Sequence, residues 1–172
     1  IWCLGFEACR YNGQKDSCNL IEKLKDYVDF ITVCPEVQIG LETPREAIRV
    51  IKEDELSPTR LVQHQTEREL SKEMYEFGKE FLLNIPKVDG FLLKSKSPSC
   101  GIKEVKIYKG IGKGSASVKG KGLFGELVME SFHHLAVEDD GRVKNYNIRQ
   151  HFLTKLYIMK NFRVIEENML KI

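Results

Sequence analysis

The chain has 172 residues, of which 42% are hydrophobic and 30% are charged, and its formal net charge at pH 7 is +2. This length and hydrophobic content suit a single domain with a real core, which we expect to span residues 1–172. The small net charge excludes a general polycation, and the lack of an apolar run of about 18 residues or of a secretory leader argues against a membrane-spanning or secreted chain.

The first part of the chain is predicted to hold two strands and a helix. It opens with "IWCLG", which we interpret as the remainder of a first strand whose beginning is missing. Residues 19–28 have apolar side chains at helical spacing and Asn19 as a candidate N-cap, so they predict a helix. Residues 29–36 are rich in β-branched side chains and end beside a proline, which predicts a strand running into a turn.

The clearest helical signal covers residues 66–83. Thr66 and Glu69 have the spacing of a capping box at the start of this segment. An apolar stripe at helical spacing follows at Leu70, Met74, Phe77 and Phe81.

The second half of the chain alternates strands with helices. Residues 88–94 and 136–139 predict short strands, and residues 122–135 and 148–162 predict helices. This alternation indicates an α/β fold, a single Rossmann-like or flavodoxin-like domain with a mostly parallel sheet flanked by helices.

Residues 109–122 contain five glycines and several lysines. Both phosphate-binding patterns fail here, because Ile107 and Gly114 stand where the P-loop needs Gly and Ser or Thr, and Ser115 ends the G-x-G-x-x-G candidate. We expect a basic surface loop without regular structure.

The chain contains five cysteines, at positions 3, 9, 18, 34 and 100. An odd number of cysteines is unlike a complete set of disulfide bonds. A hydrophobic core of this size is also stable without disulfide bonds. We therefore expect free thiols in a reducing, cytoplasmic compartment. No C-x-x-C pair occurs, so the signatures of a zinc ribbon and of thioredoxin are missing. Cys18 opens a predicted helix, and we expect it to matter only at the surface.

Three of these cysteines follow predicted strands. Cys3 lies in or just after the opening strand, Cys34 lies at the end of the second strand, and Cys100 follows the third. In an open parallel sheet, ligands bind beyond the carboxyl ends of the strands. We therefore expect the three thiols to meet at one rim of the sheet, as in a metal or cluster site.

Three thiolates at wide sequence spacing, with no histidine near them, fit a soft metal or an iron–sulfur cluster. A structural zinc site would need a fourth ligand, which Cys9 in the neighbouring turn could supply. Iron–sulfur clusters normally take four cysteines. A cluster held by only three leaves one iron open to water or substrate, where it can act as a Lewis acid.

Four segments carry a family resemblance: "CLGFEACRYNG", "VCPEVQIGLETPRE", "DGFLLKSKSPSCG" and "GKGLFGELV". Together they make the chain resemble, from end to end, the catalytic module of the thiouracil and thiouridine desulfidase family. The resemblance implies a [4Fe–4S] cluster on Cys3, Cys34 and Cys100 with its fourth iron open, and leaves Cys9 as the second choice of ligand. It also implies hydrolysis of the C=S group of thiouracil or 4-thiouridine to C=O, without net redox chemistry. The family's R-Y-D-G turn has Asn12 here instead of Asp.

The family motif places its acid–base carboxylate at Glu36. Hydrolysis of C=S requires a base to activate water and an acid to protonate the ring nitrogen or the departing sulfide. A carboxylate near a cluster in a dry pocket can have a raised pKa and serve both steps. In the S-P-S-C segment, Ser97 corresponds to the hydroxyl of the family motif, and it is suited to orienting water or substrate. Ser99 is the less favoured candidate for this role.

Five further side chains are candidates for substrate contact. Arg10 and Arg45 are planar donors, and Tyr11 offers a stacking surface. The positive charges of Lys94 and Lys96 could stabilise a negatively charged sulfide or a phosphate.

Positive charge is concentrated in two stretches of the chain. Residues 94–122 carry eight lysines and one Glu, and residues 142–172 carry seven Lys or Arg and two Glu. A basic face of this kind fits a polyanion such as tRNA, which a free base would not require. Lysine-rich loops also serve solubility.

Two alternatives stay open at this point. An iron–sulfur or zinc RNA-binding module without catalysis would need neither Glu36 nor Ser97. A plain α/β domain with buried thiols would bind no iron at all.

Overall fold

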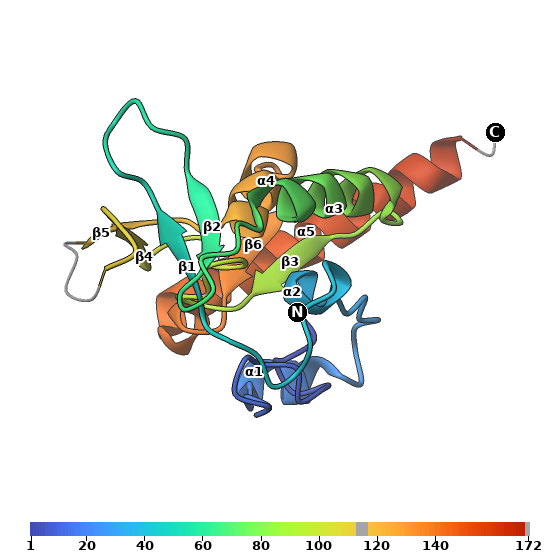
Figure 1. Cartoon of the computed structure of the whole chain (residues 1–172). Coiled ribbons are helices and arrows are strands. Elements are labelled where there is room, and N and C mark those ends of the chain that lie inside the picture. Colours follow the sequence, from blue (N-terminus) through green and yellow to red (C-terminus); the bar gives the residue numbers. More distant parts are fainter. Residues whose placement is uncertain (113–116, 171–172) are drawn as a thin grey trace.

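The computed structural model describes residues 1–112 and 117–170, in which helices pack around two small β-sheets (Figure 1). One sheet pairs β3 (Gly90–Leu93) with β6 (Ala136–Asp139) in parallel. The other has the strand order β2–β1–β4–β5, with β1 at Ile48–Ile51, β2 at Arg60–Gln63, β4 at Val105–Tyr108 and β5 at Ser117–Gly120. The predicted α/β class is confirmed.

The prediction of one mostly parallel, Rossmann-like sheet is wrong. Strand β1 pairs with β4 in parallel, but β1 with β2 and β4 with β5 are antiparallel. Only eight residues separate β1 from β2, and eight separate β4 from β5. A parallel pair needs a crossover of a dozen or more residues, so these short connections favour antiparallel neighbours. The prediction of a single domain over residues 1–172 stays a prediction.

The two strands predicted near the N-terminus are wrong. Residues 1–18 make only an isolated bridge, between Leu4 and Asp16, and residues 29–34 belong to no sheet. The two segments still lie together, since the Trp2 N–H donates to the Val33 carbonyl at 2.9 Å. Helix α2 (Pro35–Gln38) begins directly after Cys34 because a proline at the first helical position has a suitable φ and needs no N–H partner.

The predicted helices are present with shifted ends. α1 (Asn19–Leu24) is shorter than the predicted 19–28, and its N-cap position is Cys18 instead of Asn19, without a side-chain capping bond. α4 (Leu123–Ser131) and α5 (Tyr146–Met169) confirm the other two later helices. A short 3₁₀ helix, η1 (Arg142–Lys144), precedes α5.

α3 (Ser71–Asn84) begins five residues later than predicted, and the capping box is wrong. The Thr66 hydroxyl donates to Glu46 at 2.9 Å instead of capping the helix. The Ser71 hydroxyl accepts from the Leu61 N–H at 2.9 Å. Contacts with β2 and with the segment before β1 therefore decide where this helix begins. The predicted loop over residues 109–122 contains β5, and its residues 113–116 lie outside the described part of the chain.

The buried side chains form two hydrophobic clusters. The larger one lies between the four-stranded sheet and helices α3 and α4, around Leu61, Met74 and Phe124. The smaller one contains four of the five cysteines together with Ile21 and Phe152. One of these cysteines is Cys18, only 6% exposed, so the prediction that it matters only at the surface is wrong. At the start of the short helix α1, the Cys18 side chain is buried in the hydrophobic core.

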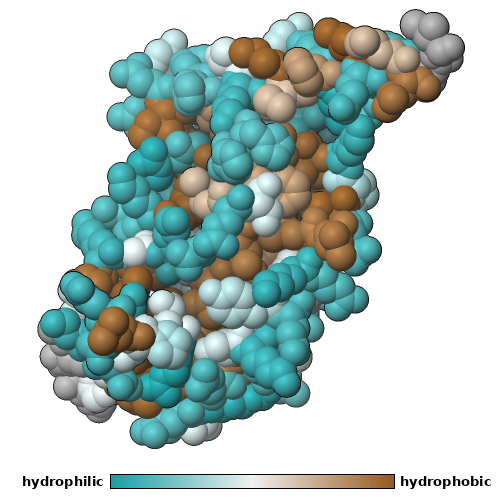
Figure 2. All heavy atoms as spheres, turned by 90° about the horizontal axis from the view of Figure 1, so that it is seen from above, coloured by the Kyte–Doolittle hydropathy of each residue, from teal (hydrophilic) through white to brown (hydrophobic). Residues whose placement is uncertain are grey.

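Helix α5 extends beyond the rest of the molecule at its C-terminal end (Figure 1). Its last turns expose the apolar side chains of Ile158, Phe162, Ile165 and Met169. Their spacing is that of an amphipathic helix face. Hydrophobic surface is visible toward the upper right of Figure 2. None of the described helices combines the length and hydropathy that a bilayer span requires.

Candidate active site

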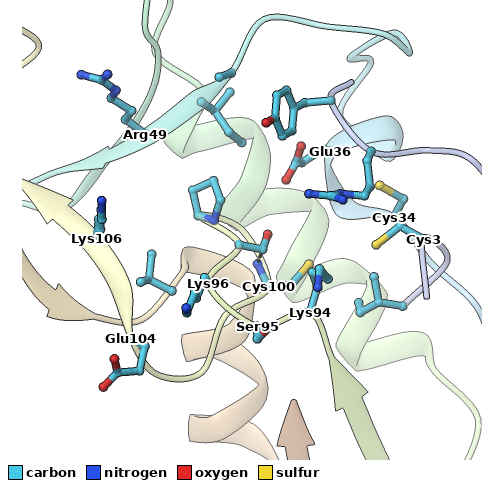
Figure 3. Close-up of a pocket in the computed structure, with 18 of the residues that line it drawn as sticks. Cys3, Cys34, Glu36, Arg49, Lys94, Ser95, Lys96, Cys100, Glu104 and Lys106 are labelled. Carbon is cyan, nitrogen blue, oxygen red and sulfur yellow. Dashed lines mark hydrogen bonds between the residues drawn. The ribbon is translucent and has the colours of Figure 1, made fainter. Parts of the chain in front are cut away.

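A pocket of about 840 Å³ opens between the N-terminal segment and the four-stranded sheet. Its inner end is lined by Cys3, Cys9, Cys34 and Cys100, and its outer wall by residues of β1, β4 and β5. Figure 3 shows the side chains of Cys3, Cys34 and Cys100 converging on one region, between Glu36 and Lys94. The structure thus brings together the three cysteines that sequence analysis expected to meet.

The four cysteines of the pocket come from three parts of the chain that are distant in sequence. Each is at most 6% exposed, and all are free thiols. Cys34 is the residue before α2, and Cys100 ends the turn that follows β3. Cys18 lies in the same core but outside the wall of this pocket.

The thiols influence one another's ionisation. A hydrogen bond from the Cys9 thiol lowers the pKa of Cys34 to about 7, and it lowers the pKa of Cys3 as well. The same two contacts raise the pKa of Cys9. Burial raises the pKa of Cys100, with the charge of Glu36 adding to the effect. Thiolates are the metal-binding form of cysteine, so Cys3 and Cys34 are the two thiols most readily converted to ligands.

The thiols at the inner end of the pocket are the type of ligand that iron–sulfur clusters take. Within residues 1–112 and 117–170, no three Cys, His, Asp or Glu side chains are gathered tightly enough to hold one metal ion. Zinc needs every thiolate at about 2.3 Å from one point. A cubane instead binds its cysteines through separate irons, which places the sulfurs farther apart.

Glu36 lies beside the thiols and both of its oxygens are engaged. Oε2 accepts from Arg45 Nη2 at 2.6 Å and Nε at 2.9 Å, and Oε1 accepts from the Ser99 hydroxyl at 2.9 Å. The Arg45 side chain is 5% exposed, and its Nη2 also donates to the Cys9 carbonyl at 3.0 Å. Arg45 therefore ties the carboxylate to the cysteine-bearing loop. The sequence did not show that this arginine would be buried in an ion pair.

The two serines of S-P-S-C have different positions. Ser99 is fully buried and holds Glu36, whereas Ser97 lines the pocket. The Ser97 hydroxyl oxygen accepts from the N–H groups of Ser99 and Cys100, at 3.3 and 3.1 Å, so it also shapes the turn that presents Cys100. Sequence analysis underrated Ser99, because only the fold shows which hydroxyl reaches the carboxylate.

Glycines of the G-K-G-L-F-G segment let α4 approach this turn closely. A Cβ at Gly125 would lie 2.7 Å from the carbonyl oxygens of Cys100 and Gly101. The Gly125 N–H donates to the Ser99 carbonyl at 2.9 Å, and the Gly122 N–H donates to Gly101 at 2.7 Å. A side chain at Gly125 would not fit unless α4 or the Cys100 turn shifted.

Lys94 and Arg10 line the pocket but are held by acidic partners. Lys94 Nζ lies 2.7 Å from Asp140 and 3.0 Å from Asp16, and Arg10 lies 2.7 Å from Asp16. Burial alone would lower the pKa of Lys94, but its bonds to Asp140 and Asp16 raise it. Lys94 thus joins the N-terminal loop to the end of β6.

Tyr11 and Lys96 are exposed at the pocket and remain available to a substrate. Tyr11 is 47% exposed. Lys96 has φ 58°, a left-handed conformation, in the turn before Cys100. Both lie on the wall of the pocket, and their contact with a substrate stays a prediction.

The outer wall of the pocket is basic, and sequence analysis missed its residues. Lys106 of β4 stands opposite Lys119 of β5, and Arg49 of β1 lies over the Tyr108 ring at 4.7 Å from its centroid. Lys119 is paired with Glu104. Among the described residues, Lys96, Arg49 and Lys106 have no carboxylate within 4.0 Å. The only sequence feature that indicated a basic wall was the lysine-rich composition of residues 94–122.

Comparison with known proteins gives three matches. The model of a family described as 2-thiouracil desulfurase matches residues 2–140. The uncharacterized protein YbbK of Bacillus subtilis (strain 168) is 31% identical over 144 residues, which is 80% of this chain and 93% of that protein. The solved structure of the [4Fe-4S]-dependent thiouracil desulfidase TudS is similar with a TM-score of 0.59 and 26% identity, over 87% of this chain and 93% of the other.

Proposed function

The chain belongs to the 2-thiouracil desulfurase family, and we propose that it hydrolyses the C=S group of thiolated uracil to C=O. The family and the structural neighbour together indicate a thiouracil desulfidase that depends on a [4Fe–4S] cluster. The observation that carries the proposal is the gathering of Cys3, Cys34 and Cys100 in one pocket with Glu36. The substrates we propose are 4-thiouridine in tRNA and free 2- or 4-thiouracil.

Cys3, Cys34 and Cys100 would hold the cluster. When bound, the cluster supplies an iron with an open position, a Lewis acid that attracts the thiocarbonyl sulfur. Water adds its oxygen to the carbon and the sulfur leaves as sulfide, so the reaction transfers no electrons between substrate and protein.

Glu36 is the group we assign to proton transfer. It takes a proton from the attacking water and returns one to the ring nitrogen or the departing sulfide. Arg45 and Ser99 orient the carboxylate, because they bond to its two different oxygens. Ser97 lines the pocket, and its hydroxyl hydrogen can point to the water or to the substrate oxygen. These roles make Glu36 and Ser97 catalytic and Arg45 and Ser99 positioning residues.

The outer wall supports a substrate larger than a free base. Of the basic residues that line the pocket, Arg49, Lys96 and Lys106 have no carboxylate within 4.0 Å in the described part of the chain. Lysines directly opposite each other in a sheet repel, so an anionic ligand between them would lower the energy of the outer wall. A ribose phosphate backbone supplies such an anion, and Tyr11 offers a stacking surface for a base. This charge distribution favours 4-thiouridine in tRNA over free thiouracil.

Neutralising the outer wall should separate the two substrates. With Arg49→Gln and Lys106→Gln combined, we expect a higher KM for thiolated tRNA and an unchanged KM for free thiouracil. The salt dependence of tRNA binding should become weaker, its slope falling by about one for each phosphate that is no longer neutralised. Lys72→Gln on α3, an exposed lysine outside the pocket, is the control. Equal effects on both substrates would argue against a backbone-binding role for this wall.

The function itself is tested by purifying the protein without oxygen and counting its iron and sulfide. One cubane gives about four of each per chain. The brown protein should then release sulfide from 2-thiouracil, 4-thiouracil or 4-thiouridine-containing tRNA, with loss of the thiocarbonyl absorbance. Zinc in place of iron would contradict the proposal. A full cluster with no turnover of any of these substrates would favour an RNA-binding module without catalysis.

All five cysteines are free, which supports the reducing cytoplasm as the location of this enzyme.

A further inference from the structure

Arg49 and Tyr108 form a stacked pair at the outer wall of the pocket, and neither side chain takes part in the proposed proton transfers. The Arg49 guanidinium carbon lies 4.7 Å from the centroid of the Tyr108 ring. Both side chains line the pocket and are half-buried, so each keeps surface that a ligand can reach. Figure 3 shows Arg49 and Lys106 on the opposite side of the pocket from Cys3 and Cys34.

The pairing of the strands places this stacked pair beside two lysines. The parallel register that pairs Ile51 with Tyr108 sets Arg49, two residues earlier in β1, level with Lys106 of β4. In the antiparallel pairing of β4 with β5, Lys106 stands opposite Lys119. Because side chains alternate between the two faces of a sheet, Arg49, Tyr108 and the two lysines project from the same face. This face therefore combines a planar surface with positive charge.

Contacts within the protein do not balance the charge of Arg49. Among the described residues it has no carboxylate within 4.0 Å, and its Nη1 donates to the Ile111 carbonyl at 3.4 Å. Arg60, on the neighbouring strand β2, instead lies 2.7 Å from Glu53 and 3.8 Å from Glu69. The charge of Arg60 is thus satisfied within the protein, whereas that of Arg49 stays available to a ligand.

The chemistry of 4-thiouridine directs its sugar toward this wall. The C4 thiocarbonyl and the N1 atom that carries the ribose lie at opposite ends of the uracil ring. With the sulfur directed at the cysteine end of the pocket, N1 and the ribose therefore point outward. The pocket volume of about 840 Å³ lies in the upper part of the range of small-molecule sites, about 300–1,000 Å³, so room remains beside a single base.

We propose that the Arg49–Tyr108 pair is a binding site for the nucleobase that adjoins the thiolated uridine in an RNA strand. This inference rests on the proposed function. Unpaired bases stack on aromatic rings and on the guanidinium planes of arginines, and this pair offers both. Lys106 lies beside it, where its charge can bind the phosphate between the two nucleotides. Because every base has an aromatic face, the site should accept any neighbouring base.

The test compares substrates of equal charge that differ only in the neighbouring base. Dinucleotides that join 4-thiouridine to uridine, to adenosine or to an abasic residue are prepared with the neighbour on the 5′ or on the 3′ side. For one of the two sides, we expect wild type to have a KM about 5- to 150-fold lower with a base than without it, the usual effect of one stacked base. Uridine and adenosine should give similar KM values, and kcat should be the same for all three dinucleotides.

Variants of the pair separate stacking from charge. Arg49→Lys keeps the positive charge but lacks the planar guanidinium, and Tyr108→Leu removes the ring. Each should raise the KM of the base-bearing dinucleotide to that of the abasic one and leave the KM of free 4-thiouracil unchanged. Tyr108→Phe keeps the ring and should behave as wild type. Arg149→Lys is the control, because its guanidinium lies 5.6 Å from the centroid of the Tyr146 ring, outside the pocket.

The outcomes distinguish this inference from the proposed function. Wild type that desulfurates 4-thiouracil and has equal KM for the base-bearing and abasic dinucleotides would overturn the stacking site alone. A base effect that survives in both Arg49→Lys and Tyr108→Leu would place the neighbouring base elsewhere, which also overturns the assignment. If Tyr108→Leu does not fold, Arg49→Lys alone decides the question. Wild type that turns over neither 4-thiouracil nor any of the dinucleotides would overturn both proposals.

Discussion

Replacing Glu36 with Gln should leave the cluster intact and lower turnover of thiolated uracil by about 10²–10⁴-fold or more. Gln can still accept from Arg45 and interact with Ser99, so the shape of the site is kept. It cannot take up a proton from water. The rate is measured from the loss of thiocarbonyl absorbance and the release of sulfide, and the cluster from iron content and colour.

The substrate should still bind to the Glu36→Gln protein, because binding does not require the residue at position 36 to take up a proton. We therefore expect the loss in kcat, with little change in the binding of 4-thiouridine. Arg45 keeps the acceptors Cys9 O, Glu42 O and Thr43 Oγ1, which limits the cost of leaving its charge without a carboxylate. Glu42→Gln, an exposed carboxylate on the same loop, is the matched control. Near-native turnover with a full cluster would remove Glu36 from the mechanism.

The two serines extend the same experiment. Ser99→Ala removes the donor to Glu36 Oε1 and should lower kcat less than Glu36→Gln does, because Arg45 still holds the other oxygen. Ser97→Ala should also slow turnover while the cluster is retained. Equal kcat for Ser99→Ala and wild type would show that Arg45 alone orients the carboxylate.

Changing Cys3, Cys34 or Cys100 to Ser should abolish the cluster in each case. A serine hydroxyl is a harder and far less acidic ligand than a thiol, so it does not replace a thiolate on iron. Each variant should be colourless when purified without oxygen, with little iron or sulfide and no turnover. The measurement is the iron and sulfide count together with the absorption spectrum.

Cys18→Ser is the control for these variants. Cys18 is buried in the core beside the site but does not line the pocket, so its change should cost folding stability and spare the cluster. A thermal unfolding midpoint below that of wild type, with a full iron count, is the expected result. Retention of a full cluster by Cys100→Ser would refute the ligand set and make Cys9 the next ligand to test.

The sequence by itself determined the elements whose signal is local. The apolar stripe of α3, the helices α4 and α5, and the strands β3 and β6 could be read from periodicity over a few turns or residues. The same local reading identified the four motif segments that carry the family resemblance. It also selected Cys3, Cys34 and Cys100, although two of the three strands thought to precede them do not exist.

Only the tertiary structure decided which of these groups act on one another. Ser99 reaches Glu36 across 63 residues of sequence, and Lys94 reaches Asp140 across 46. The basic outer wall arises because β1, β4 and β5 pair side by side, which places Arg49 and Lys119 at one pocket although they are 70 positions apart. Periodicity reports which face of an element is apolar, but not which distant side chain that face will meet. Hydrogen bonds, ion pairs and the position of Cys9 depend on those distant partners, and so the chemistry of this site is a property of the folded chain.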